Sequence, residues 1–267
     1  MGFAEKFEEK VRETIKQYKL LQKEEKVAVA ISGGKDSATA LYLLKKFGYA
    51  AEALFIDLRI ENYSEENLKI AKDLCEKLGV KLNVVKLDNG IKIKDCRMCG
   101  ILKKWVMNKY ARKLKAQKLV TGHNLDDEIE TFLMNIFQGN FELNAALGPK
   151  PGLALDKKFV QRVKPLYFCT NEEIERYAIE KNIAFNKKSC PLSKNAFRKV
   201  VRKFIRQMAL QNKNFKHDLA NKILEMKSLF KAPEEKEVMY CKICGEPSRN
   251  EVCKRCKILK SAAAPTF

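Results

Sequence analysis

The feature that most constrains the fold is the stretch KVAVAISGGKDSATALYLLKKFG at residues 26–48, where an apolar run meets two glycines and then a helix-like segment. The same alternation continues downstream. Apolar, strand-like runs are predicted at 26–31, 51–57, 80–87 and 117–121, and helical stretches at 37–47, 64–78, 99–115 and 124–138. This order predicts an α/β fold with a doubly wound parallel sheet, whose helices cover both faces. Ligands of such sheets bind beyond the carboxyl ends of the strands.

The composition along the chain predicts four parts. They are an N-terminal amphipathic helix at 1–25, the main α/β domain, expected to be catalytic, at 26–190, a basic helical extension at 191–236, and a cysteine-rich knuckle with a tail at 237–267. Glycines and prolines make 139–165 a predicted loop-rich crossing, and the polar segment KAPEEKE at 231–237 a predicted linker. Further helices are expected at 171–181, 195–211 and 214–231.

The loop Ser32-Gly33-Gly34-Lys35-Asp36-Ser37 predicts an anion site between the first strand and its helix. It is not a Walker loop, which needs four residues between its first glycine and the sequence G-K-[ST]. The physics is related, because glycines let backbone N–H groups approach an anion and the helix adds its positive end. Lys35 and the hydroxyls of Ser32 and Ser37 can complete the cradle.

Net charge points to a polyanionic partner. The chain carries 53 Lys and Arg against 33 Asp and Glu, a formal net charge of +20. The excess is concentrated in residues 91–118, with a net charge of +9, and in 186–231, with +11. Such patches favour nucleic acid as a partner. In 195–211, Arg202 and Arg206 are predicted to follow phosphates. We expect a cytoplasmic location, since the N-terminal segment has charges throughout and no apolar run is long enough to cross a bilayer.

The nine cysteines indicate metal or thiol chemistry, because disulfides are rare in the cytoplasm. The series Cys241-x2-Cys244-x8-Cys253-x2-Cys256 has the spacing of a tetrahedral zinc site. Cys96 and Cys99 form another C-x-x-C pair, and Cys190 stands far from them in sequence. For Cys75 and Cys169 we expect core positions.

These motifs together resemble a known family. The loop SGGKDS is similar to the PP-loop of ATP pyrophosphatases, which adenylate a substrate oxygen and release pyrophosphate. The segments DCRMCGILKKWVMNKYAR, TGHNLDDEIETFLMNIFQGN and KSCPLSKNAFRKVVRKFIR look like those of tRNA 2-thiolation enzymes of the TtcA/TtuA type, and CKICGEPSRNEVCKRC resembles the zinc knuckle of the TtuA and wobble-thiolation branch. Residues 1–25 contain no cysteine, whereas that branch also carries an N-terminal zinc finger.

The resemblance implies roles for particular residues. ATP contacts fall on Ala30, Ile31, Ser32, Asp36, Ile56, Gly122 and Asp127, in addition to the loop residues Gly33, Gly34, Lys35 and Ser37. Asp36 would help to place ATP or Mg²⁺. Lys103 and Asp127 would be catalytic beside the cysteines, while His123 is expected to shape the turn. Cys96, Cys99 and Cys190 would hold a [4Fe–4S] cluster; persulfide chemistry and a simple zinc site are the alternatives that spacing leaves open.

The implied reaction is the replacement of uracil O2 in a tRNA by sulfur, with ATP converted to AMP and pyrophosphate. The sulfur donor would be a ubiquitin-like thiocarboxylate protein or free sulfide, and a homodimer is compatible with the sequence. Two alternatives stay open at this point. One is a tRNA-modifying ligase of the lysidine synthetase type, which needs no cysteine triplet. The other is a zinc-knuckle RNA-binding protein whose PP-loop is inactive.

Overall fold

The computed structural model describes residues 1–267 except 88–90, 92, 153–155, 194–196, 231–237 and 264–267, and it leaves the side chains of 261–263 undescribed. The predicted linker at 231–237 therefore lies outside the described residues. Among the described residues, no helix is both long enough and apolar enough to cross a membrane.

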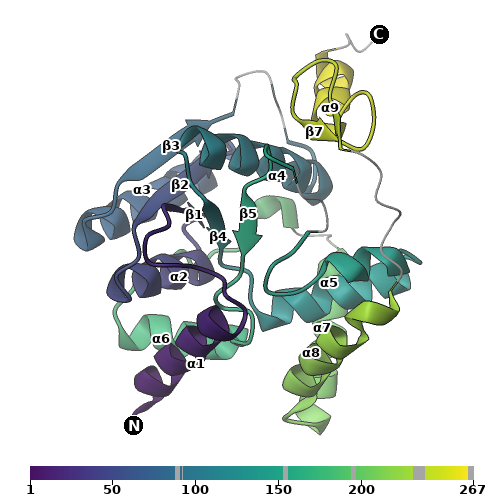
Figure 1. Ribbon diagram of the computed structural model, residues 1–267. Coiled ribbons are helices and arrows are strands. Elements are labelled where there is room, and N and C mark those ends of the chain that lie inside the picture. The colour runs from purple at the N-terminus through teal and green to yellow at the C-terminus, as the bar shows by residue number, and fades with distance from the viewer. Residues whose placement is uncertain (88–90, 92, 153–155, 194–196, 231–237, 264–267) are drawn as a thin grey trace.

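A five-stranded parallel sheet occupies the centre of the main body (Figure 1). Its strands are β1 (Val27–Ile31), β2 (Ala51–Asp57), β3 (Leu82–Lys86), β4 (Lys118–Thr121) and β5 (Gln161–Val163). Their order is β3-β2-β1-β4-β5, and all four pairings are parallel. The order changes direction between β1 and β4, which is where ligands of such sheets bind. The predicted doubly wound sheet is confirmed.

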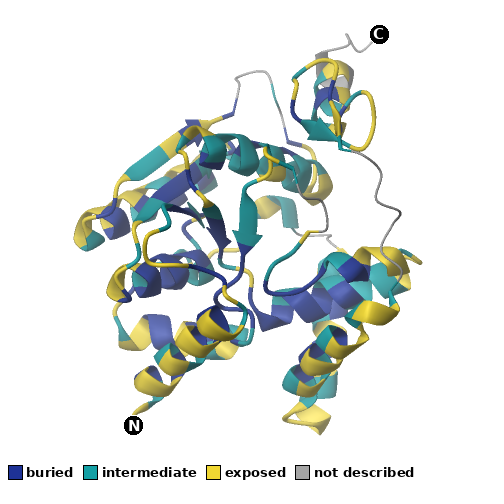
Figure 2. Ribbon diagram, in the orientation of Figure 1, coloured by how far each residue is buried: buried dark blue, intermediate teal, exposed yellow. Residues whose placement is uncertain are grey.

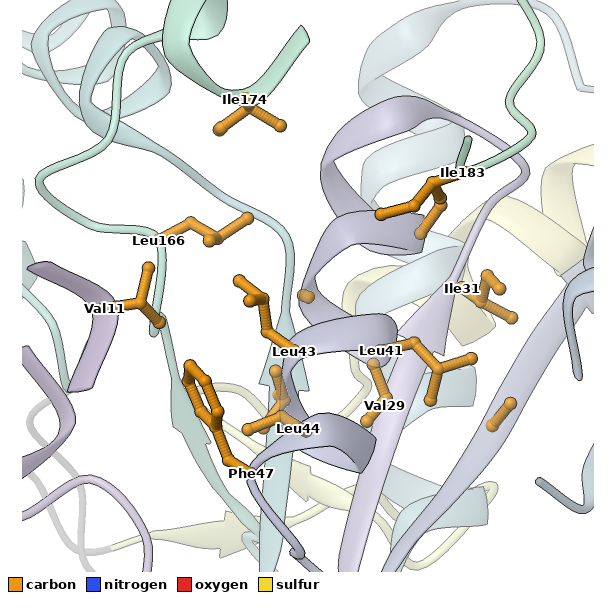
Figure 3. Packing of buried hydrophobic residues seen from close by; sticks show 14 of the residues in the cluster. Val11, Val29, Ile31, Leu41, Leu43, Leu44, Phe47, Leu166, Ile174 and Ile183 are labelled. Carbon is orange, nitrogen blue, oxygen red and sulfur yellow. The ribbon is translucent and has the colours of Figure 1, made fainter. Parts of the chain in front are cut away.

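The first face of the sheet is covered by four helices, α1 (Phe3–Gln17), α2 (Lys35–Lys46), α3 (Glu61–Leu78) and α6 (Asn171–Glu180). Alternate residues of β1, such as Val29 and Ile31, point into this layer because side chains alternate along a strand. Figure 3 shows the α2 residues Leu41 and Leu44 among them. Phe7 of α1 lies in the same core and is 2% exposed.

The second face is covered by α4 (Cys96–Lys113). Leu102 and Val106 of this helix pack with Leu54 of β2, while Ala111 packs with Ala28 of β1. Ala28 lies between Val27 and Val29 in sequence and belongs to the opposite layer, as the pleat requires. One helix therefore crosses the second face, packing on β2 through its middle and on β1 near its last turn.

A helical unit with a core of its own is formed by α5 (Leu125–Phe137), α7 (Phe197–Gln211) and α8 (Phe215–Glu225), with the short 3₁₀ helices η1 (Phe141–Ala146) and η3 (Met226–Leu229). A third 3₁₀ helix, η2 (Pro191–Ser193), lies instead near the start of α4, where Leu192 packs with residues of that helix. Val201 and Ile205 of α7 are buried against α5 and α8. Arg202 pairs with Glu130, a carboxylate whose side chain is 1% exposed, so this arginine fastens α7 to α5. Figure 2 shows exposed outer faces on α7 and α8.

The C-terminal knuckle consists of β6 (Met239–Tyr240), β7 (Pro247–Ser248) and α9 (Lys254–Ala263). It lies against α4 and the segment before β5. Arg112 of α4 pairs with Glu246, and Lys158 donates to the carbonyl of Gly245 at 2.8 Å. The Tyr240 hydroxyl donates to Asp156 at 2.7 Å.

Strand β5 corrects the prediction for 139–165, which was expected to be a loop. Gln161 and Arg162 are polar, so this three-residue strand shows no apolar run. It forms because β4 offers an unpaired edge, on which Lys118 pairs with Gln161 in parallel register. The other predicted strands and helices are present within a few residues of the expected bounds.

Candidate active site

The PP-loop closes on itself at the carboxyl end of β1. The backbone N–H of Ser32 donates to Ser37 Oγ at 3.1 Å, and that hydroxyl donates to the carbonyl of Gly34 at 3.0 Å. Gly34 is the N-cap of α2 and supplies no capping side chain. The first N–H groups of α2 are therefore available to an anion, as the sequence predicted.

Two glycines permit close approach around this loop. Gly33 has φ +78°, and a Cβ at that position would lie 2.4 Å from Asn67 Oδ1. A Cβ on Gly122, after β4, would lie 2.6 Å from the backbone nitrogen of Ser37. Gly122 is thus required for the end of β4 to touch the start of α2, whichever ligand binds there.

Lys35 belongs to a network that connects three helix N-termini. Its Nζ lies 2.7 Å from Asp36 Oδ1 and 2.7 Å from Asn171 Oδ1. Asn124 Nδ2 donates to the same two oxygens, at 3.0 and 3.1 Å. The sequence analysis did not identify Asn124 and Asn171, and the only signal was their position at helix starts. This network fixes the side chain of Lys35 within the PP-loop, where its amine can meet phosphate oxygens.

Three carboxylates lie near this network, and their surroundings differ. Asp126 is buried and already has two partners. Its Oδ1 pairs with Lys216 Nζ at 2.7 Å, and its Oδ2 accepts from the N–H of Asn171 at 2.7 Å. Asp127 caps α5 with Asn124 and has Arg198 at 3.4 Å. Burial raises the pKa of Asp36, Lys35 opposes that rise, and the charge of Asp127 adds to it. Asp36 and Asp127 thus offer hard oxygen ligands in the same region, which suits Mg²⁺.

A pocket of about 90 Å³ opens at the carboxyl ends of β1 and β2. Its lining includes predicted ATP contacts and the predicted catalytic lysine: Ala30, Ile31, Ser32, Ile56 and Lys103. Tyr63 and Asn67 of α3 also line it, and the sequence gave no signal for them. The structure therefore brings Lys103 of α4 to the same hollow as the PP-loop strand.

The predicted cluster cysteines meet at the start of α4. Asp95 caps this helix by accepting from the N–H of Met98 at 2.7 Å. The exposed Cys96 thiol donates to the carbonyl of Leu192 at 3.2 Å, which brings the segment after Cys190 against the helix. Burial raises the pKa of Cys99, Lys103 opposes that rise, and Cys190 and Cys96 add to it. Lys103 therefore stands close enough to the cysteines to stabilise a thiolate.

His123 follows the end of β4 and is exposed. Its Nδ1 is 2.9 Å from Thr121 Oγ1. Nearby protein atoms, followed by the charges of Lys164 and Arg198, lower its pKa. Because the ring contacts its own turn, the expectation that His123 shapes that turn stays the simplest interpretation.

Four knuckle cysteines form a compact metal-ligating set. The Sγ atoms of Cys241, Cys244, Cys253 and Cys256 all lie within 4.8 Å of one another. Burial would raise the pKa of Cys241, but the N–H groups of Cys253, Cys244 and Ile243 outweigh it and lower that pKa. These amides favour a thiolate at Cys241, the form that binds zinc, whereas burial raises the pKa of Cys253 and of Cys256. Cys96, Cys99 and Cys190 do not form such a set at this distance.

Comparison with known proteins identifies the family. A model of the PP-loop domain matches residues 3–212. The chain is 39% identical over 266 residues to the tRNA-5-methyluridine(54) 2-sulfurtransferase of Pyrococcus horikoshii, covering 96% of this chain and 85% of the relative. It belongs to the PP-loop family of tRNA 2-thiolation enzymes. The enzyme of the same name from Thermotoga maritima is 31% identical, over 97% of this chain and 88% of that protein.

A solved structure of this thiolation family has the same architecture. The U34-tRNA thiolase NcsA of Methanococcus maripaludis, with its [4Fe–4S] cluster, matches with a TM-score of 0.83 and 28% identity, over 99% of this chain and 89% of that chain. These relatives support thiolation over both the lysidine-type ligase and the inactive RNA-binding protein. The roles of individual site residues are tested by none of them and stay predictions.

Proposed function

We propose that this thiolation-family protein adenylates O2 of a tRNA uridine and replaces that oxygen with sulfur, giving 2-thiouridine or a derivative. The position of α4 carries the proposal. Its first turn holds Cys96 and Cys99, and one turn later Lys103 lines the pocket shared with the PP-loop strand. ATP in that pocket and sulfur held at the cysteines would be neighbours along one helix.

The first step makes O2 a leaving group. Uracil O2 attacks the α-phosphorus of ATP, pyrophosphate departs, and Asp127 takes the uracil proton. The N-terminus of α2 and Lys35 offset charge on the phosphates, while Asp36 would help to hold Mg²⁺. Asn124 and Asn171 keep Lys35 oriented, because both lie within its hydrogen-bond network.

In the second step a sulfur nucleophile adds to C2 and AMP leaves with the electron pair of the C–O bond. Cys96, Cys99 and Cys190 would hold a [4Fe–4S] cluster, and they fit it in being half-open to solvent and spread more widely than ligands of one ion. When bound by three thiolates, such a cluster supplies one open iron for an external sulfur. Lys103 stabilises negative charge at this point.

The donor is proposed to be a ubiquitin-like thiocarboxylate protein or free sulfide, and tRNA is the proposed macromolecular substrate. Two relatives, at 39% and 31% identity, are both named for position 54. Mass spectrometry of tRNA from a deletion strain should therefore examine that uridine first and position 34 second. The four-part domain division, the homodimer and the cytoplasmic location stay proposals of the same kind, and a knuckle zinc ion is proposed at Cys241, Cys244, Cys253 and Cys256.

Lys35→Ala tests the PP-loop reading directly. We expect tRNA-dependent ATP–pyrophosphate exchange to fall at least about 100-fold, because a cation at the phosphates is removed. Iron and zinc content should not change. Lys45→Ala is the matched control, since Lys45 is an exposed lysine on the same helix. Wild-type exchange in the Lys35 variant would reject the phosphate cradle.

A further inference from the structure

A second cavity lies on another face of α4 and has no role in the chemistry above. It has a volume of about 150 Å³, which gives room for a planar group the size of a nucleic-acid base. Successive helical residues are 100° apart, so Trp105 points about 200° away from Lys103. The cavity is lined by Val85, Lys86, Leu87, Ile91, Leu102, Trp105, Val106, Lys109, Tyr110 and Arg255.

The walls of this cavity differ in chemistry. Buried aliphatic side chains, such as Leu102 and Val106, form an apolar part. Trp105 and Tyr110 supply aromatic surface. Lys109 Nζ lies 4.7 Å from the Trp105 ring centroid, and Arg255 Cζ lies 4.2 Å from it. None of the described lining residues is acidic. Such a cavity suits a flat ligand that carries negative charge.

Trp105 has an unmet hydrogen-bonding need. Its indole Nε1 is buried and has no partner among the described residues. A buried donor without an acceptor costs free energy, so an acceptor supplied by a ligand would be favoured there. Nucleic-acid bases carry ring nitrogens and carbonyl oxygens at their edges that can accept such a bond.

The knuckle contributes to this cavity. Arg255 lies next to the metal-ligating Cys256, and Trp105 packs against the knuckle cysteines. The cavity is therefore formed jointly by α4, β3 and α9. Its shape depends on the knuckle being folded, which connects the metal site with whatever the cavity holds.

We propose that this cavity takes one unstacked base of the tRNA substrate, with the Arg255 guanidinium as a stacking surface and Lys86 and Lys109 at the flanking phosphates. The inference rests on the proposed function, because it assumes tRNA as the partner. Single-stranded RNA is recognised by stacking bases on aromatic rings and guanidinium planes. The cavity provides both kinds of surface, and α4 lies within the strongly basic residues 91–118. A thiolation enzyme must also hold a large tRNA in one orientation, which a single site at the uridine cannot do.

The chain has one tryptophan, so tryptophan emission, excited where its eight tyrosines do not absorb, reports on this cavity alone. We expect saturable quenching of Trp105 in the holoenzyme when unmodified tRNA transcript is added. ATP or AMP alone should leave the emission unchanged, and quenching by either would reassign the cavity to a mononucleotide. Trp105→Phe keeps an aromatic wall without the N–H, and it should weaken tRNA binding about two- to fivefold by filter binding.

The basic residues that line the cavity are tested by replacing them with alanine, next to a control replacement outside the cavity. Arg255→Ala and Lys109→Ala should each raise the tRNA Kd about tenfold. Lys257→Ala removes the same charge from an exposed position of α9 that does not line the cavity, and it should have little effect. Equal effects of Arg255→Ala and Lys257→Ala, at normal zinc content, would overturn the proposal. If tRNA binds and is thiolated but Trp105 emission does not respond, the cavity assignment alone fails; absence of any tRNA binding would reject the proposed function.

Discussion

The two cysteine sites of this molecule differ in the sequence separation of their cysteines and in the exposure of their thiols. The knuckle set comes from one short segment, residues 241–256, and three of its four thiols are buried. The trio of Cys96, Cys99 and Cys190 joins the start of α4 to a segment 91 residues after Cys99, and none of its thiols is fully buried. Structural metal sites are closed, whereas sites of chemistry keep an open position. The difference in exposure therefore separates a site that stabilises structure from one that can meet a substrate.

The two sites also differ in the spacing of their sulfur atoms. Zn–S bonds of about 2.3 Å in a tetrahedron place sulfurs roughly 3.8 Å apart, which agrees with the compact knuckle set. The trio does not gather within 4.8 Å. A [4Fe–4S] cluster at the trio stays the proposal, and metal analysis separates it from a single zinc ion and from persulfide chemistry.

The largest expected effect comes from the open site. Cys96→Ala, Cys99→Ala or Cys190→Ala should remove iron and abolish tRNA thiolation, since each change deletes a proposed ligand. The knuckle lies elsewhere in the fold, so zinc should stay near one per chain. Anaerobic metal analysis and tRNA mass spectrometry measure both. Full iron in all three variants would show that the trio holds no cluster.

Cys253→Ser removes one of the four thiols of the knuckle site. The variant should lose zinc and unfold the knuckle, because structural zinc contributes on the order of 10 kcal/mol to such small units. Iron and ATP binding should survive. Limited proteolysis after Lys254 or Arg255, with metal content in parallel, follows the change. Zinc retained at the wild-type level would show that Cys253 is not a zinc ligand and that the knuckle is not the closed metal site proposed here.

Arg112→Met separates docking of the knuckle from its metal. The change removes the partner of Glu246, whose side chain is 8% exposed, at an expected cost of about 1–3 kcal/mol. Hydrogen exchange in the knuckle should become faster while zinc stays bound. Lys113→Met, at the exposed neighbouring position, is the control. Equal exchange rates in the two variants would mean that the ion pair does not hold the knuckle.

The smallest effect concerns Cys75, which belongs to neither site. Burial raises the pKa of its thiol to about 11 from a usual 9. Above pH 9 the unfolded chain loses this proton first, so the free energy of unfolding falls between pH 9 and 11, by at most about 1.4 kcal/mol per pH unit. Cys75→Ala should flatten that slope in urea titrations, although its cavity lowers stability at every pH. An unchanged slope would show that the thiol titrates normally.

Local patterns allowed the parallel sheet and the PP-loop to be predicted, because a strand, two glycines and a helix are contiguous in SGGKDS. The knuckle set was equally readable from its spacing. The hydrogen bonds of Lys35 were not, since Asn171 lies 136 residues away and only the fold brings it near. Strand β5 was missed because its residues are polar and edge pairing alone makes it a strand.

The extension at 191–236 shows why the role of a basic residue cannot be predicted from the local charge of the sequence alone. Arg202 was expected to follow phosphates, yet it pairs with the buried Glu130. A basic residue on a helix looks the same in sequence whether it meets solvent or a buried carboxylate. Among the cations of this helix, Lys199 and Arg206 are exposed, and the expectation of phosphate contacts is better tested at Arg206 than at Arg202. The cavity beside Trp105 likewise depends on contacts between distant segments.

Helix α4 has a consequence for how this enzyme can change during evolution. It carries Cys99 of the cysteine trio, Lys103 at the pocket beside the PP-loop strand, and Trp105 and Arg112 against the knuckle. Because each helical residue turns by 100°, the gain or loss of one residue between Cys99 and Lys103 would swing every later side chain away from its partner. We therefore expect an insertion that a surface loop would tolerate to disturb the pocket and the docking of the knuckle together. Substitution, and not a change of length, is the change that we expect this helix to accept between Cys99 and Arg112.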